Sequence, residues 1–179
     1  MMWFLGVAVA ITAVAAWLDF RTGEIPNWLT FGALGAGPIA HLFVTLVHTG
    51  HRVEALQDAG LAIIGGALCA IVPVGLYRVE AIGGGDVKLF IALGAVLRPL
   101  AGIEAQVWSF CAAAMVAPFW LAYEGKLFRT VSNAAFLLAN PMLPKDRRRK
   151  LDPETLSWFR MGPAIFLGTL ITAYLHLRD

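Results

Sequence analysis

Long, uninterrupted apolar runs constrain this chain more than any other feature of its sequence. Hydrophobic residues make up 59% of its 179 residues and charged residues 15%, whereas soluble domains contain about 45–50% apolar and about 25% charged residues. The runs show neither a helical stripe nor a strand alternation, and they reach the roughly 18 residues that a helix needs to cross a bilayer. We therefore predict an all-α, polytopic membrane protein that forms one integral membrane domain, residues 1–179.

Six transmembrane helices are predicted from the positions of these runs. Their approximate bounds are Trp3–Leu18, Trp28–Val47, Ala59–Tyr77, Val87–Leu97, Leu100–Tyr123 and Trp158–Leu175. The fourth run is short for a span, so it either leans on neighbouring helices or continues past Pro99. Glycines at positions 32, 35, 37, 65 and 66 would allow helix backbones to approach closely.

The basic residues predict the orientation of the chain. Eleven of the 14 Lys and Arg residues follow or border the connections after the first, third and fifth spans, and only Arg52, Arg98 and Arg178 lie on the other side. The positive-inside rule then places the eleven in the cytoplasm and both termini outside an inner, or plasma, membrane. The net charge of +2 is too small to indicate a nucleic-acid partner.

One long connection, residues 124–157, is predicted on the cytoplasmic side. Its first part, Lys126–Ala139, carries apolar residues at helical spacing and is typical of an amphipathic helix that lies on the membrane. The basic run Lys145–Lys150 would lie among the anionic head groups of the membrane lipids. The alternative is a topology determinant with no further role.

Two aspartates, Asp19 and Asp86, are brought to the same membrane face by this topology. Asp19 ends the first span and Asp86 opens the fourth, and ionisable residues at a membrane edge are costly enough to indicate a function. Two close carboxyl groups cannot both ionise easily, so one keeps its proton near neutral pH. The ionised member can take a proton from water while the other donates one, so the pair can hydrolyse a peptide bond without a metal, cofactor or covalent intermediate.

The residues around Asp86 fit either a reactive site or an ordinary loop. Gly83, Gly84 and Gly85 permit positive φ and the close approach of a bound peptide. A plain loop in which Asp86 caps the following helix fits equally well. The segment is not a Walker A sequence, which argues against a phosphate-binding loop.

The residues after Asp19 also allow two interpretations. Pro26 and Asn27 form a turn in which Asn27 can cap the next helix. Arg21 could hold a carboxylate or a substrate carbonyl. Taken alone, this segment is an ordinary turn between two helices.

Together the two segments resemble the type IV prepilin peptidases, which are membrane aspartic peptidases of the GxGD kind. The pattern Asp-x-Arg-x-x-x-Ile-Pro-Asn covers residues 19–27, Gly-x-Gly-Asp-x-Lys covers residues 83–88, and Met161–Ile165 looks like the Gly-Pro-Ala signature of that family. The resemblance implies that Asp19 and Asp86 are the catalytic pair, and that the site is shaped by Arg21, Asn27, Gly83, Gly84, Gly85 and Lys88. It also implies removal of the leader from prepilin or pseudopilin substrates, by cleavage after a glycine at the cytoplasmic membrane face.

The chain departs from the longer members of that family in one respect. Those members carry an extra N-terminal cytoplasmic segment with paired cysteines, and they also methylate the new pilin N-terminus. Here Cys69 and Cys111 both lie in predicted spans, so we expect buried thiols and no methyltransferase activity. The short form is similar to the peptidases of tight-adherence (Flp-type) pilus systems or to an archaeal preflagellin-type relative.

Two other functions are kept as alternatives. A small transporter or channel would use the acids to carry protons or cations, although transporters tend to place such acids near the midplane. A non-catalytic scaffold for pilus assembly would tolerate degenerate acids. No HExxH pattern occurs, and we predict that His41 is packed and hydrogen-bonded rather than a metal ligand.

Overall fold

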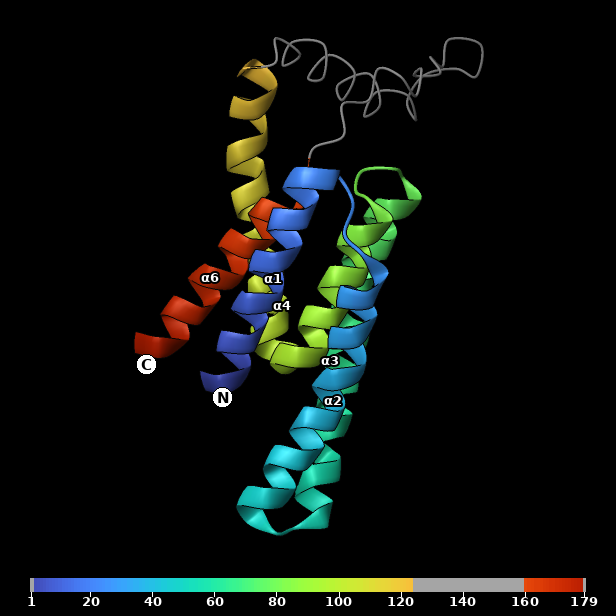
Figure 1. Cartoon of the computed structure of the whole chain (residues 1–179), viewed down its shortest axis with the longest axis vertical. Coiled ribbons are helices and arrows are strands. Elements are labelled where there is room, and N and C mark those ends of the chain that lie inside the picture. The colour runs from blue at the N-terminus through green and yellow to red at the C-terminus, as the bar shows by residue number, and fades with distance from the viewer. Residues whose placement is uncertain (1, 124–159, 179) are drawn as a thin grey trace, which may run out of the picture. The chain divides into compact units, whose positions relative to one another are not determined.

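The computed structural model describes residues 2–123 and 160–178, and within these ranges the chain is helical apart from short turns (Figure 1). The helices are α1 (Met2–Thr22), α2 (Asn27–Thr49), α3 (Arg52–Arg78), α4 (Gly84–Tyr123) and α6 (Gly162–Arg178). The chain divides into two compact units, one of Met1–Ala113 with Arg160–Asp179 and one of Ala114–Phe159. All contacts described below belong to the first unit. The predicted loop 124–157, with its amphipathic and basic segments, lies outside the described residues.

Three of these helices, α1, α2 and α3, are long and apolar enough to cross a membrane. Many of their large apolar side chains point outward, and Ile39, Phe43 and Ile71 are each about two-thirds exposed. Such surfaces suit a hydrocarbon solvent rather than water. Over the described residues, the predicted all-helical class is therefore confirmed, with three candidate spans. Cys69 is buried as expected, but the expected burial of Cys111 is wrong, because its side chain is exposed on α4.

Helices α1, α2 and α3 extend beyond the predicted spans, whereas α6 begins at Gly162 rather than at Trp158. Helix α1 continues past Leu18 to Thr22, and α3 begins at Arg52 rather than at Ala59. Hydropathy marks only the part of a helix that suits lipid, whereas the backbone hydrogen bonds continue through the polar turns at its ends.

Helix α4 reverses its direction at Arg98, where φ is 66° and ψ is 176°. The next residue, Pro99, has no N–H to continue the helical hydrogen bonds. A Cβ at Gly102 would lie 2.9 Å from the Cα atom of Gly94, although eight residues of straight helix span about 12 Å. The part of α4 after Arg98 therefore folds back on the part before it, and the break falls between the predicted fourth and fifth spans.

Polar side chains from α2 and α3 hold this turn in place. The Nη1 atom of Arg98 lies 2.9 Å from Oδ1 of Asp58, and Oδ2 of Asp58 accepts a hydrogen bond of 2.7 Å from Thr45. His41 is buried, and its Nε2 atom donates to the carbonyl of Val96 at 2.9 Å. The prediction of a packed and hydrogen-bonded His41 is thus confirmed.

Glycines let α2 and α3 lie directly against the first part of α4. A Cβ at Gly37 would lie 2.8 Å from the carbonyl oxygen of Ala95, and one at Gly65 would lie 2.8 Å from the carbonyl carbon of Arg98. Gly94 fills the matching position on α4, because a Cβ there would lie 2.7 Å from the carbonyl carbon of Gly65. The close approach predicted for the glycines is therefore present at positions 37, 65 and 66, but it is wrong for Gly32 and Gly35, where a Cβ would meet no atom within 4 Å.

The helices of the first unit place four chain segments at one end. The end of α1, the start of α2 and the start of α4 gather there, together with the start of α6, while the turn between α2 and α3 lies at the opposite end (Figure 1). Contacts between side chain and backbone join these segments, as described next.

Candidate active site

Asp19 lies in the last turn of α1 and is only 6% exposed. Its Oδ2 atom accepts a hydrogen bond of 3.0 Å from the backbone N–H of Gly162, the first residue of α6. A Cβ at Gly162 would lie 2.7 Å from this oxygen and 2.8 Å from the Cβ atom of Asp19. The start of α6 thus covers the carboxyl group so closely that only glycine fits.

Asp86 lies in the first turn of α4 and is 8% exposed. Its Oδ2 atom accepts a hydrogen bond of 3.2 Å from the backbone N–H of Gly83. The side chain therefore reaches back to the residue before the helix, as the third residue of a capping box does. The prediction that Asp86 caps a helix starting at Val87 is wrong, because α4 already begins at Gly84 and Asp86 lies inside it.

The three glycines before Asp86 do not adopt the positive φ that glycine permits. The glycines with positive φ are Gly23 and Gly50, not those of this segment. The segment instead leaves little room for side chains. A Cβ at Gly85 would lie 3.2 Å from the Ile25 side chain, and a Cβ at Gly83 would lie 3.1 Å from Oδ2 of Asp86. These contacts bring the start of α4 against the turn that follows α1.

The negative charge of Asp19 acts on Asp86. Asp86 precedes the apolar run that begins at Val87, and burial together with the negative charge of Asp19 raises the pKa of Asp86 to about 7. Asp86 is therefore held near the midpoint of its titration at neutral pH. A buried pair of acids in which one member keeps its proton is the arrangement that acid–base hydrolysis requires.

Asn27 and Lys88 join α2 to α4 beside this pair. The Asn27 side chain makes no cap hydrogen bond at the start of α2, so the predicted cap is wrong. Its Oδ1 atom instead accepts a hydrogen bond of 2.8 Å from Nζ of Lys88, whose ammonium group also lies 5.5 Å from the ring centre of Phe31. A charge-assisted hydrogen bond satisfies the amide better than a neutral backbone donor does.

Arg21 does not contact either aspartate. Its guanidinium lies over the ring of Trp17, 4.6 Å from the ring centre, and its side chain is exposed. The structure thus joins Asn27 to Lys88 and Gly83 to Asp86. It leaves Arg21 on the outside of α1, where a cation and an indole stabilise each other.

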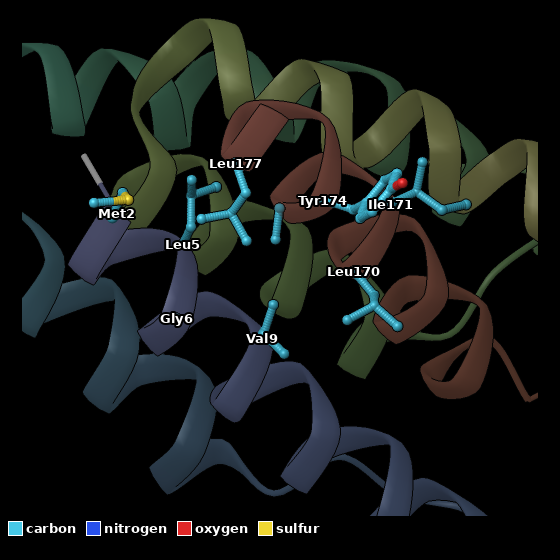
Figure 2. Close-up of a pocket in the computed structure, with 9 residues that line it drawn as sticks. Met2, Leu5, Gly6, Val9, Leu170, Ile171, Tyr174 and Leu177 are labelled. Carbon is cyan, nitrogen blue, oxygen red and sulfur yellow. The ribbon is translucent and has the colours of Figure 1, made fainter. Parts of the chain in front are cut away.

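An apolar groove lies between α1 and α6, away from the two aspartates (Figure 2). It has a volume of about 710 Å³. Its walls include Met2, Leu5 and Val9 of α1 and Leu170, Tyr174 and Leu177 of α6. These residues belong to the ends of α1 and α6 that are remote from Asp19 and Gly162, and none of the described residues that line the groove carries a carboxyl group.

Comparison with known proteins decides the family. A family model described as the type IV leader peptidase family matches residues 6–118, which is more than half of the chain and includes both Asp19 and Asp86. The chain belongs to the type IV leader peptidase family. No curated protein and no solved structure matches it.

This leader peptidase is therefore a peptidase by family, as predicted, and prepilin-type proteins are the substrates of that family in general. The match and the apolar helices agree on association with a membrane. Within the described residues, no group of three or more His, Cys, Asp or Glu side chains is arranged to hold a metal ion.

Two residues that act on Asp19 were not assigned a role by sequence reasoning. Gly162 was noted only as part of a signature, and Arg160 only as a border of the basic loop. Arg160 donates a hydrogen bond to the carbonyl of Phe20, next to Asp19, and its charge acts on Asp19. The sequence feature that could have indicated this role is the pair Gly162–Pro163, which begins the last predicted span at the same membrane face as both aspartates.

Proposed function

We propose that the protein is a membrane aspartic endopeptidase that removes the leader from prepilin or pseudopilin substrates. In this proposal Asp19 and Asp86 are the catalytic pair, and cleavage follows a glycine at the cytoplasmic face. The observation that carries it is the pair itself, since α1 and α4 each bury one carboxyl group and the charge of Asp19 acts on Asp86, within a member of the leader peptidase family. Lys88, Asn27 and the glycines 83–85 shape the site by fixing the start of α4.

Hydrolysis by such a pair accounts for every proton. The ionised carboxylate takes a proton from a water molecule while the water oxygen attacks the scissile carbonyl carbon, and the protonated carboxyl group gives its proton to the carbonyl oxygen. The resulting tetrahedral diol then collapses. The carbon–nitrogen bond breaks, the nitrogen receives a proton from the first carboxyl group, and a diol hydroxyl returns a proton to the second. Both acids end as they began.

The depth of the site fits the substrate. We propose that α4, bent at Arg98, and α6 cross the membrane along with the three candidate spans, which gives six spans in one membrane domain. The end that carries Asp19 and Asp86 then faces the cytoplasm, because the basic connections lie there. A basic leader would lie in the cytoplasm, and the apolar helix of the pilin would lie in the bilayer beside the enzyme.

Replacing either acid by its amide tests the proposal. Asp19→Asn and Asp86→Asn keep the size of the side chain but remove the proton exchange, so each should abolish leader cleavage. Co-expression with a prepilin and mass spectrometry of the product measure cleavage. Glu24→Gln is the matched control, because Glu24 is an exposed acid of the neighbouring turn and should be dispensable.

The alternatives give different results in the same experiment. Cleavage at the wild-type rate by either Asn variant would overturn the assignment of the pair. A transporter would lose ion flux in these variants and would not cut the prepilin in any form. A scaffold would be insensitive to both changes. The mass of the cleaved pilin also tests the expected lack of methyltransferase activity, because a methylated N-terminus would contradict it.

A further inference from the structure

The two aspartates have different surroundings, although their chemistry is the same. Asp19 receives a hydrogen bond from outside its own helix, through the buried N–H of Gly162, and it lies at the positive end of α6. Asp86 receives its hydrogen bond from Gly83, three residues earlier in the same segment. Donors and a helix N-terminus favour the negative form of a carboxyl group.

The charges around the pair have the same asymmetry. Burial disfavours the ionised form of Asp19, and two groups oppose it: the N–H of Gly162 and the positive charge of Arg160, which lies two residues before α6. The Arg160 guanidinium is fixed by its hydrogen bond to the carbonyl of Phe20. From α1, the charge that acts on Asp86 is the negative charge of Asp19. One carboxyl group therefore has a cation beside it, and the other has an anion.

We propose that the start of α6, through the Gly162 amide and the Arg160 guanidinium, positions Asp19 as the ionised member of the pair. Asp19 is then the general base that activates water, and Asp86 is the acid that protonates the scissile carbonyl oxygen. This assignment rests on the proposed peptidase function and goes beyond it, because the chemistry of the pair alone leaves the two roles interchangeable. Gly162 and Arg160 are positioning residues in this scheme, since neither contacts the peptide.

The structure makes Gly162 sterically obligatory. Alanine at this position would place a methyl group 2.7 Å from Oδ2 of Asp19 and 3.1 Å from its Cγ atom, so the carboxyl group must move or α6 must retreat. Displacement of a catalytic group by about 1 Å can lower a rate by about 10²-fold. Gly162→Ala should therefore lower kcat/KM by about that factor, while the backbone N–H itself is retained.

The decisive test is the pH profile of leader cleavage by the full chain in detergent micelles. Arg160→Gln should move the acidic limb of kcat/KM to higher pH, because the base is harder to ionise without its cation. The shift should be less than about one pH unit, since Arg160 is exposed and solvent screens its charge. Arg160→Lys should restore the wild-type limb, and Arg178→Gln, at the far end of α6, should leave it unchanged.

A purely structural role for the α6 start predicts a different pattern. The acidic limb of the kcat/KM–pH profile of Arg160→Gln would then lie at the same pH as in wild type. That result would overturn the proposal, whatever the absolute rate of the variant. Gly35→Ala is the control for Gly162→Ala, because a Cβ at Gly35 meets no atom within 4 Å. If wild-type protein fails to cleave any prepilin, the proposed function is wrong. If wild-type protein cleaves and the acidic limb of the Arg160→Gln profile does not shift, only the assignment of Asp19 as the base is wrong.

Discussion

At the residue scale, the most informative group is Asp86, because its pKa lies near neutral pH. Burial and the Asp19 charge raise its pKa to about 7, so the protonated form predominates below that pH and is lost as the pH rises above it. If Asp86 is the proton donor, kcat/KM should fall on the alkaline side by about tenfold per pH unit. Leader cleavage measured across neutral and alkaline buffers checks this.

Reversibility is the control for that profile. Enzyme held at alkaline pH and then assayed at neutral pH should recover its full rate, which separates titration from unfolding. A rate that stays constant from neutral to clearly alkaline pH would contradict the role of Asp86 as the acid. The raised pKa also means that ionised Asp86 destabilises the fold, so Asp86→Asn should be at least as stable as wild type at alkaline pH while it is inactive.

At the element scale, α4 depends on a close backbone contact with α3. A Cβ at Gly94 would lie 2.8 Å from the Cβ atom of Cys69 and would also collide with the backbone of Gly65. Neither backbone can yield without moving a helix, so Gly94→Ala should lower the free energy of unfolding by about 1–3 kcal/mol. Thermal unfolding in micelles measures the loss, and leader cleavage should fall with it, because the same helix carries Asp86.

Gly75→Ala is the matched control for this prediction. A Cβ at Gly75 meets nothing within 4 Å, and alanine is a better helix former than glycine by about 1 kcal/mol. This variant should be as stable as wild type or slightly more stable. Equal stability of the Gly94 and Gly75 variants would mean that α3 and α4 do not pack through glycine backbones.

At the scale of the whole molecule, the features that sequence predicts well are those that depend on order along the chain. Apolar runs gave the helical class, and the gap between the fourth and fifth predicted spans coincides with the break in α4 at Arg98. Alternation of the chain across a bilayer then places Asp19 and Asp86 at one end, although 67 positions separate them in sequence.

Contacts between distant side chains were not predictable in the same way. Asn27 has a favourable local role as a cap, yet Lys88 binds it across 61 positions because a charged donor is stronger than a backbone N–H. The hydrogen bond from Gly162 to Asp19 spans 143 positions. Sequence spacing places both residues near the same membrane face but cannot tell which atom of α6 lies against which carboxyl oxygen.

The orientation of the molecule gives a last prediction, because hydrolysis in the cytoplasm requires the acid end to face inward. Glu24 and Val79 lie exposed in the turns at that end, and His48 lies exposed near the opposite turn. In intact cells, a membrane-impermeant thiol reagent should label His48→Cys but should label Glu24→Cys and Val79→Cys only after the membrane is opened. Wild-type protein corrects for Cys69 and Cys111. Labelling of Glu24→Cys from outside would place Asp19 on the external face of the membrane. A leader that stays in the cytoplasm could not reach it there, so this result would contradict both the topology and the proposed site of cleavage.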